Sequence, residues 1–246
     1  MDNSIYIALS RQLALFRDMD TTANNLANAD TPGYNAEKMM FTNYLVDDGN
    51  RHKMAFAQDI SSFRNTQSGP MQVTGNPFDL AIAGPGYFAV ETALGTRYTK
   101  AGHFTIGEEG MLMTPAGNPV LDNDGQRIFM EVTDRDITVM GNGFITATTP
   151  AGDIEERGQV GLFEFEDEQK MERLNNQLFK TDQPELEPVE ARILQGTIER
   201  SNVSAIEELV RTTKLSRSVT STAKFIEIMY DLQRKTSNAY ARDGQS

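Results

Sequence analysis

The chain has 246 residues, of which 39% are hydrophobic and 24% charged, enough to bury a core in one large or two small domains. Its formal net charge of −12 argues against nucleic acid or an anionic membrane as the main partner, and no apolar run approaches the roughly eighteen residues of a membrane-spanning helix. Cysteine is absent, which excludes disulfides and thiolate sites, and the N-terminus lacks the pattern of a cleaved signal peptide.

The first element is a long helix predicted over residues 1–30. No glycine or proline interrupts it, and its apolar residues recur at alternating intervals of three and four with a single polar break at Gln12, the heptad pattern of a packing seam. The helix should end near Asn28, because the residue before Pro32 is pushed out of the helical conformation and asparagine tolerates the turn that follows. The candidate interface residues of this helix are Ile5, Leu9, Phe16, Met19, Ala23 and Leu26.

The middle of the chain has a different pattern. Residues 31–68 show weak periodicity and are predicted to form an extended connector. From residue 69 to 196, turn-forming groups such as Gly75-Asn76-Pro77 and Asn123-Asp124-Gly125 separate short runs of alternating apolar residues. Turns at such intervals predict an antiparallel β domain of about eight to ten strands.

A second long helix is predicted at the C-terminus, after a short return connector over 197–203. Ser204 and Glu207 have the spacing of a capping box, and no glycine or proline follows before Gly244. The helix over 204–246 would have roughly forty residues and a length of about 60 Å. Its candidate interface residues are Leu209, Leu215, Val219, Ala223, Phe225, Ile226, Met229 and Tyr230.

The two ends therefore match each other, and the predicted fold is α+β: two long terminal helices form a coiled-coil unit, into which an antiparallel β-rich domain is inserted. Two explanations for the helices stay open, a surface hairpin packed on the domain, or helices that are loose in the monomer and become buried by neighbouring copies. We favour the second, since the helices have more seam than one domain could cover.

Catalytic motifs are weak in this sequence. Its two histidines, His52 and His103, have no partner at metal-ligand spacing, and both are expected to be surface or turn residues. Asp122-Asn123-Asp124-Gly125 begins like a calcium loop but has no glutamate at the twelfth position, so a hairpin turn is expected. We therefore predict that the chain is not an enzyme and uses no metal, cofactor or small-molecule substrate.

Several stretches, in order, resemble the axial proteins of the bacterial flagellum, the rod, hook and hook-associated subunits. NNLANADTPGY, residues 24–34, resembles their N-terminal signature. TGNPFDLAIAGPGYFAV, RYTKAGHFTIGEEGMLMTPAGNPVL and LNNQLFKT resemble core motifs of the rod and hook group, and GTIERSNVSAIEEL with the later LSRS resembles its C-terminal signature. The matching motif residues are Asn24, Asn25, Ala27, Asn28, Pro32, Gly33 and Tyr34, and Ser201, Asn202, Val203, Ser204 and Glu207.

This resemblance implies a structural subunit of the flagellar rod. Length and the opening MDNSIYIAL are most similar to a proximal rod protein, with a distal rod protein as the alternative. The terminal helices would line a hollow shaft that transmits torque around the export channel, and the chain would turn outward after residue 28, with Tyr34 as an anchor against the β domain. The implied partners are copies of itself, other rod proteins and the flagellar type III export apparatus, in the periplasmic part of the basal body.

Two functions of other classes remain as alternatives. The β domain could recognise a cell-wall polymer while the helices only oligomerise. Alternatively, two of the many carboxylates could act as the acid and base of a glycosidase. The acidic composition favours instead a solvated, repulsive surface for most of these carboxylates.

Overall fold

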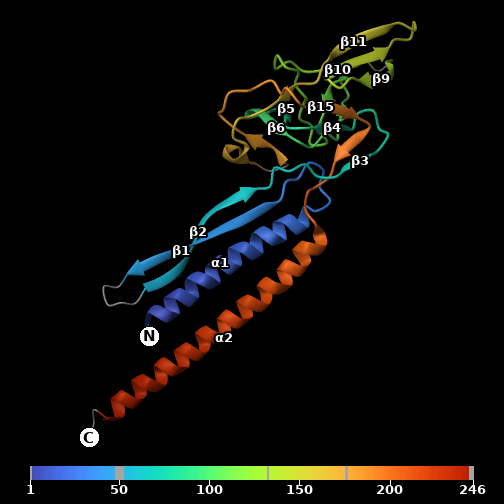
Figure 1. The fold of residues 1–246 in the computed structure, drawn as a ribbon. Helices are drawn as coiled ribbons and strands as arrows, with labels where there is room; N and C mark the ends of the chain where they lie inside the picture. Colours follow the sequence, from blue (N-terminus) through green and yellow to red (C-terminus); the bar gives the residue numbers. More distant parts are fainter. Residues whose placement is uncertain (1, 48–52, 132, 175–176, 244–246) are drawn as a thin grey trace. The chain divides into compact units, whose positions relative to one another are not determined.

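The computed structural model describes residues 2–47, 53–131, 133–174 and 177–243 (Figure 1). The chain forms two compact units that interleave along the sequence. The helical unit contains Met1–Ala27, Glu37–Asn65 and Ser204–Ser246, and the β-rich unit contains Asn28–Ala36 and Thr66–Val203. Two terminal helices and an antiparallel β-rich middle confirm the predicted elements, and each unit is described below by itself.

The helical unit is built on two long helices, α1 (Asp2–Ala27) and α2 (Ala205–Asp243), which lie side by side (Figure 1). An ion pair of 2.7 Å joins Asp18 of α1 to Arg211 of α2. Small residues, including Ala8 and Thr222, are buried on these helices, and Leu215 is the buried leucine of α2. The helices therefore pack on each other mainly through small side chains, which leaves many of their large apolar residues uncovered.

Residues 37–64 differ from the predicted extended connector. They contain an antiparallel pair of strands, β1 (Glu37–Asp47) and β2 (Lys53–Arg64), which pair from Glu37↔Arg64 to Asp47↔Lys53 and belong to the helical unit. The register shifts between Met40 and Phe41, at a β-bulge. Periodicity in this segment is too weak for its sequence to indicate this pairing, because an isolated strand pair depends on the surface that it packs against.

The β-rich unit consists of small antiparallel sheets. One has the strand order β12-β5-β6-β14-β13 and another β11-β10-β9, while β15-β4, β16-β3 and β7-β8 are two-stranded. The strands in the described residues are shorter and more numerous than predicted: β3 Met71–Val73, β4 Leu80–Ala83, β5 Tyr87–Thr92, β6 Gly95–Thr99, β7 Thr105–Ile106, β8 Leu112–Met113, β9 Arg135–Val139, β10 Phe144–Thr148, β11 Ile154–Gln159, β12 Leu162–Phe163, β13 Glu172–Arg173, β14 Phe179–Lys180, β15 Arg192–Gln195 and β16 Thr197–Glu199, with a 3₁₀ turn at Glu168–Lys170.

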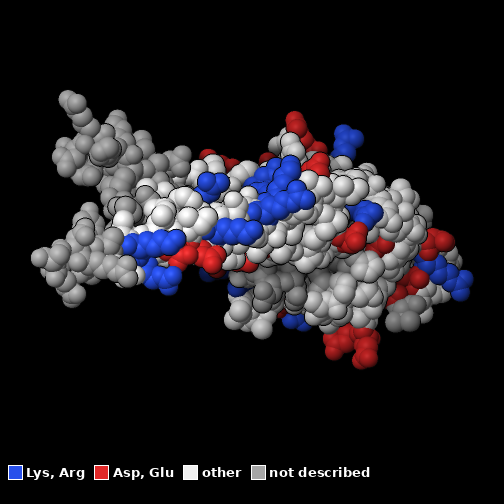
Figure 2. Space-filling model, turned by 90° about the horizontal axis from the view of Figure 1, so that it is seen from below, with Lys and Arg blue, Asp and Glu red and all other residues white. Residues whose placement is uncertain are grey.

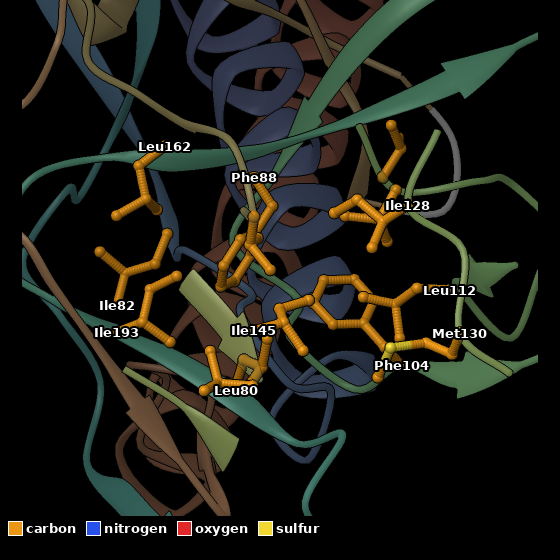
Figure 3. Close-up of a cluster of buried hydrophobic side chains, with 14 residues drawn as sticks. Leu80, Ile82, Phe88, Phe104, Leu112, Ile128, Met130, Ile145, Leu162 and Ile193 are labelled. Atoms are coloured by element: carbon orange, nitrogen blue, oxygen red, sulfur yellow. The ribbon is translucent and has the colours of Figure 1, made fainter. Parts of the chain in front are cut away.

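Strand β5 is buried on both faces and separates two hydrophobic clusters. Phe88 and Val90 belong to the larger cluster, in which the rings of Phe88 and Phe104 meet edge to face at 5.2 Å (Figure 3). Tyr87 and Ala89 belong to the second cluster. A strand buried on both faces has no polar side, which is why the run Tyr87–Val90 shows no alternation of polar and apolar residues.

Candidate functional site

Asn25, near the C-terminal end of α1, connects this helix to the start of β1. Its side chain is fully buried and binds both backbone groups of Glu37, donating from Nδ2 to the carbonyl at 2.7 Å and accepting from the amide at Oδ1 at 2.9 Å. The helix ends at Ala27, close to the predicted Asn28, and its other motif asparagine, Asn24, is exposed. Asn25 therefore fixes where β1 begins relative to the end of α1.

After α1 the chain enters the β-rich unit, where residues 28–36 lie close to other segments of the same unit. The Thr31 amide donates to the Asn28 carbonyl at 3.1 Å, and Gly33 follows with a positive φ of 69°. The Gly33 amide donates to the carbonyl of Glu199 at 2.8 Å, and a Cβ at Gly33 would lie only 2.5 Å from the amide nitrogen of Ala101. Both the backbone conformation and the available space require glycine here.

Tyr34 and Asn202 hold the outgoing and returning chain together. Tyr34 is 4% exposed, and the guanidinium of Arg173 lies 4.0 Å from its ring centroid. The Asn202 amide donates to the Tyr34 carbonyl, its Oδ1 accepts from the Ala36 amide at 2.7 Å, and its Nδ2 donates to the Gln67 carbonyl at 2.7 Å. We call the three segments 28–36, 66–70 and 197–203 the junction.

A buried carboxyl lies in the junction. Glu199 is 4% exposed and accepts at Oε1 from the Gly69 amide at 2.8 Å, while the buried Lys100 is its neighbouring cation. Burial raises the pKa of Glu199 above its ordinary value of 4.5; the Gly69 amide and Lys100 lower it in part, and Glu168 raises it further. At the solvent-exposed edge of the junction, Arg200 forms an ion pair with Asp30 at 2.5 Å.

This buried carboxyl predicts a pH dependence for the variant Glu199→Gln. Because folding raises the pKa of Glu199, its contribution to stability is fully present below pH 4.5 and is lost as the pH rises through the raised value. Glutamine can still accept from Gly69 but does not ionise. The unfolding free energy of the wild type minus that of Glu199→Gln should therefore fall between pH 4 and pH 8 in urea titrations. A difference that rises with pH would contradict the assignment.

The returning chain enters α2 through a cap. The Val203 amide donates to Ser201 Oγ at 3.2 Å, and the Glu207 amide donates to Ser204 Oγ at 3.4 Å, one of the two bonds of the predicted capping box. The helix begins at Ala205, directly after this serine.

The predicted interface residues do not share one face of the helical unit. On α1, Ile5, Met19 and Leu26 are half-buried, whereas Leu9, Phe16 and Ala23 are exposed. On α2, Leu215 is buried and Val219, Ile226 and Met229 are half-buried, whereas Leu209, Ala223, Phe225 and Tyr230 are exposed. Some of these residues therefore contact the chain itself, and the others form an uncovered apolar surface.

The sequence did not single out several residues that complete these sites. Tyr6 extends the exposed apolar row of α1 by one residue, and spacing alone could have indicated it. The junction also contains the buried Glu199, and Lys100 and Arg173 lie next to it. No sequence signal distinguishes such charged residues from the many exposed ones.

Two of the features considered for catalysis, His103 and the turn at Asp122, have structural partners. His103 Nδ1 lies 2.6 Å from Asp79 Oδ1, His52 lies outside the described residues, and the Gly125 amide closes the turn at Asp122. Among the described residues, no group of three or more His, Cys, Asp or Glu is placed to hold a metal ion. In the same residues, neither helix has the length and apolar character to cross a bilayer.

Comparison with known proteins places these features in a family. The family model for flagella basal body rod proteins matches residues 5–35, that for the D1 domain of the flagellar hook protein FlgE/F/G matches 81–160, and that for the C-terminal part of flagellar basal body rod FlgEFG proteins matches 194–239. The first and third matches contain the motifs at the two ends of the junction.

Whole-length relatives agree with these matches. The chain is 36% identical to the flagellar basal-body rod protein FlgF of Caulobacter vibrioides, over 95% of this chain and 96% of that protein, and 33% identical to FlgF of Mesorhizobium japonicum, over 91% of each. FlgG of Bacillus subtilis is 24% identical over 94% of this chain and 98% of its own length. These relatives are named as rod proteins and not as enzymes. The chain therefore belongs to the flagellar basal-body rod protein family and is FlgF-like.

Proposed function

We propose that this chain is a subunit of the flagellar rod that assembles helically through its terminal helices. In this proposal, copies of the chain and other rod proteins form a hollow shaft in the periplasmic part of the basal body, and the shaft transmits torque and encloses the export channel. The chain would leave the cell through the flagellar type III export apparatus without a cleaved signal peptide. Its identities of 36% and 33% to two FlgF proteins, against 24%, 29% and 25% to three FlgG proteins, support a proximal position.

The observation that carries this proposal is an exposed apolar row on α1. Tyr6, Leu9, Leu13 and Phe16 are 63%, 55%, 55% and 41% exposed, and their spacing places them on one face of the helix. Complete burial of an exposed side chain of this size contributes about 1.5–3 kcal/mol, and these four, each about half exposed, would contribute the corresponding part on association. We define these four residues as the α1 stripe. A contiguous apolar face of this kind on a rod-family protein is best explained as a contact between subunits.

The proposal predicts that Leu9→Asp prevents assembly. Leu9 is more than half exposed in the single chain, so aspartate should leave the fold intact, whereas a charge in a subunit contact costs several kcal/mol. We expect cells that carry only Leu9→Asp to lose motility and rods, while circular dichroism of the purified variant matches the wild type. Leu26→Asp and Ile226→Asp should also block assembly, but both positions are half-buried within the chain, so these variants also disturb folding.

The matched control is Leu94→Asp, the same substitution at an 82% exposed leucine in the turn between β5 and β6. We expect cells with this control to assemble rods and swim. Motile cells with complete rods that contain Leu9→Asp would overturn the proposal.

A further inference from the structure

We infer that the α1 stripe of one copy packs against the end of α2 in the next copy, so that the contact joins two different surfaces of the same protein. The inference rests on the proposed function and specifies its contact. The α2 surface consists of Phe225, Ile228 and Leu232, which are 48%, 58% and 49% exposed and which we call the α2 stripe.

The other faces of α1 are already occupied within the chain. Asp18 pairs with Arg211 of α2, and Asn25 binds the backbone of Glu37 at the start of β1. Ala8 and Ala14 are buried, whereas every residue of the α1 stripe is more than 40% exposed. Within the described residues, the stripe is thus the large apolar face of α1 that its own chain leaves open.

Helix α2 extends beyond the helix that it packs on. It has 39 residues against 26 in α1, and the pairing is antiparallel, since Asp18 meets Arg211 while Ala8 and Thr222 line one groove of about 490 Å³. This register places the first residues of α1 opposite Met229 or its neighbours. Residues 230–243 therefore have no α1 residue opposite them, and α2 continues past the end of α1 (Figure 1). Within the α2 stripe, Phe225 also lines the groove with Ala8 of its own chain, whereas Leu232 lies beyond the end of the pairing.

The two stripes match in spacing. Their residues follow at intervals of three and four positions, so each stripe forms one straight ridge. With the helices antiparallel, Phe16 can face Phe225 while Leu13 faces Ile228 and Leu9 faces Leu232. If neighbouring copies have the same orientation, α1 of one copy runs antiparallel to α2 of the next, as it does within one chain. The register of this contact is shifted from the register within the chain by about twelve residues, or about 18 Å.

Charges beside the stripes are complementary. Asp20 lies one turn beyond Phe16, and Arg217 and Lys224 precede or flank the α2 stripe; none of these three has an ion pair among the described residues. Arg17 also lies beside the α1 stripe, but it interacts within its own chain. Figure 2 shows Lys and Arg side chains on this side of the molecule with Asp and Glu side chains among them, in a protein whose net charge is −12. An acidic residue next to the α1 stripe thus has basic partners on the α2 face.

A contact between unlike surfaces suits a rod. Pairing of two α1 stripes would be symmetric, would close at a dimer and would leave the α2 stripe exposed, whereas a contact between unlike surfaces repeats without closing. A second group of exposed apolar residues, Ile206, Leu209 and Val210, lies at the start of α2 and spans fewer positions than the α2 stripe before Thr213 follows. That group is therefore too short to cover the α1 stripe.

The absence of cysteine allows a direct test with full-length protein. We would mix the single variants Leu13→Cys and Ile228→Cys under mild oxidation, because a disulfide forms only when two Cβ atoms come within about 4.5 Å. The expected result is a heterodimer in at least about tenfold greater yield than from Leu94→Cys mixed with Ile228→Cys, a difference of about 1.4 kcal/mol. Tryptic mapping would confirm that positions 13 and 228 are joined.

Each outcome decides the question. A yield equal to that of the Leu94→Cys control overturns the pairing, and so does a predominant homodimer of Leu13→Cys, which would show symmetric α1 pairing. If Leu9→Asp blocks rod assembly but the heterodimer does not form, the pairing is wrong and the proposed function stands. If Leu9→Asp leaves assembly unchanged, the proposed function itself fails.

Discussion

Gly33→Ala is expected to destabilise the β-rich unit by about 2–5 kcal/mol, the combined cost of a clash in a packed site and of a left-handed backbone for a residue with a Cβ. The new Cβ would lie 2.5 Å from the Ala101 nitrogen and 2.6 Å from the Lys100 carbonyl carbon. Both are backbone atoms that cannot rotate away, so the outgoing chain would have to separate from the strand end that it crosses. The loss of stability is measured as the shift in the midpoint of urea unfolding, recorded with a probe in the β-rich unit.

Gly125→Ala separates the two causes. Gly125 also has a positive φ, 76°, but a Cβ there would meet no atom within 4 Å. This control should cost only the backbone term, about 1–2 kcal/mol. Equal losses at the two positions would show that the close approach at Gly33 contributes nothing to stability.

Asn25→Ala is expected to cost the helical unit about 2–5 kcal/mol. The substitution removes two hydrogen bonds to Glu37 at a position with no solvent exposure, and a buried backbone group that loses its partner costs about 1–3 kcal/mol. The start of β1 should loosen first, so the amide of Glu37 should exchange its hydrogen much faster than in the wild type. Native-state hydrogen exchange measures both the global and the local effect.

The control for this variant is Asn24→Ala, which changes the same residue type one position earlier on the exposed side of α1. Both substitutions alter helix propensity similarly, and Asn25 is the one whose side chain bonds to the Glu37 backbone, so faster exchange at Glu37 in Asn25→Ala but not in Asn24→Ala identifies this contact. If Asn25→Ala leaves exchange at Glu37 unchanged, Asn25 does not fix the start of β1.

The junction was predictable only in part. Gly33, Tyr34 and Asn202 belong to motifs that the sequence identified, because turn residues and a conspicuous aromatic are local signals. Their partners were not predictable. Glu199, Lys100 and Arg173 are distant in sequence from residues 28–36, and a charged residue in a list of charged residues carries no sign of its burial.

The sequence by itself determined the two long helices, their ends and the β-rich middle. Heptad spacing without glycine or proline, the serine cap of α2 and the frequent turn residues act within a few positions, so local physical chemistry is enough to specify them. It also determined that the helices carry more apolar surface than one chain buries.

Only the tertiary structure decided which side of each helix its own chain covers. A heptad pattern marks apolar spacing but is the same for a partner within the chain and for a partner in another copy, so the predicted seam combined both. In the folded chain, contacts between distant residues determine which seam residues are covered. These contacts are the Asp18–Arg211 ion pair, the Asn25–Glu37 hydrogen bonds and the β1–β2 pairing, which no local signal indicated. What remained uncovered, the α1 and α2 stripes, is decided by where those contacts lie.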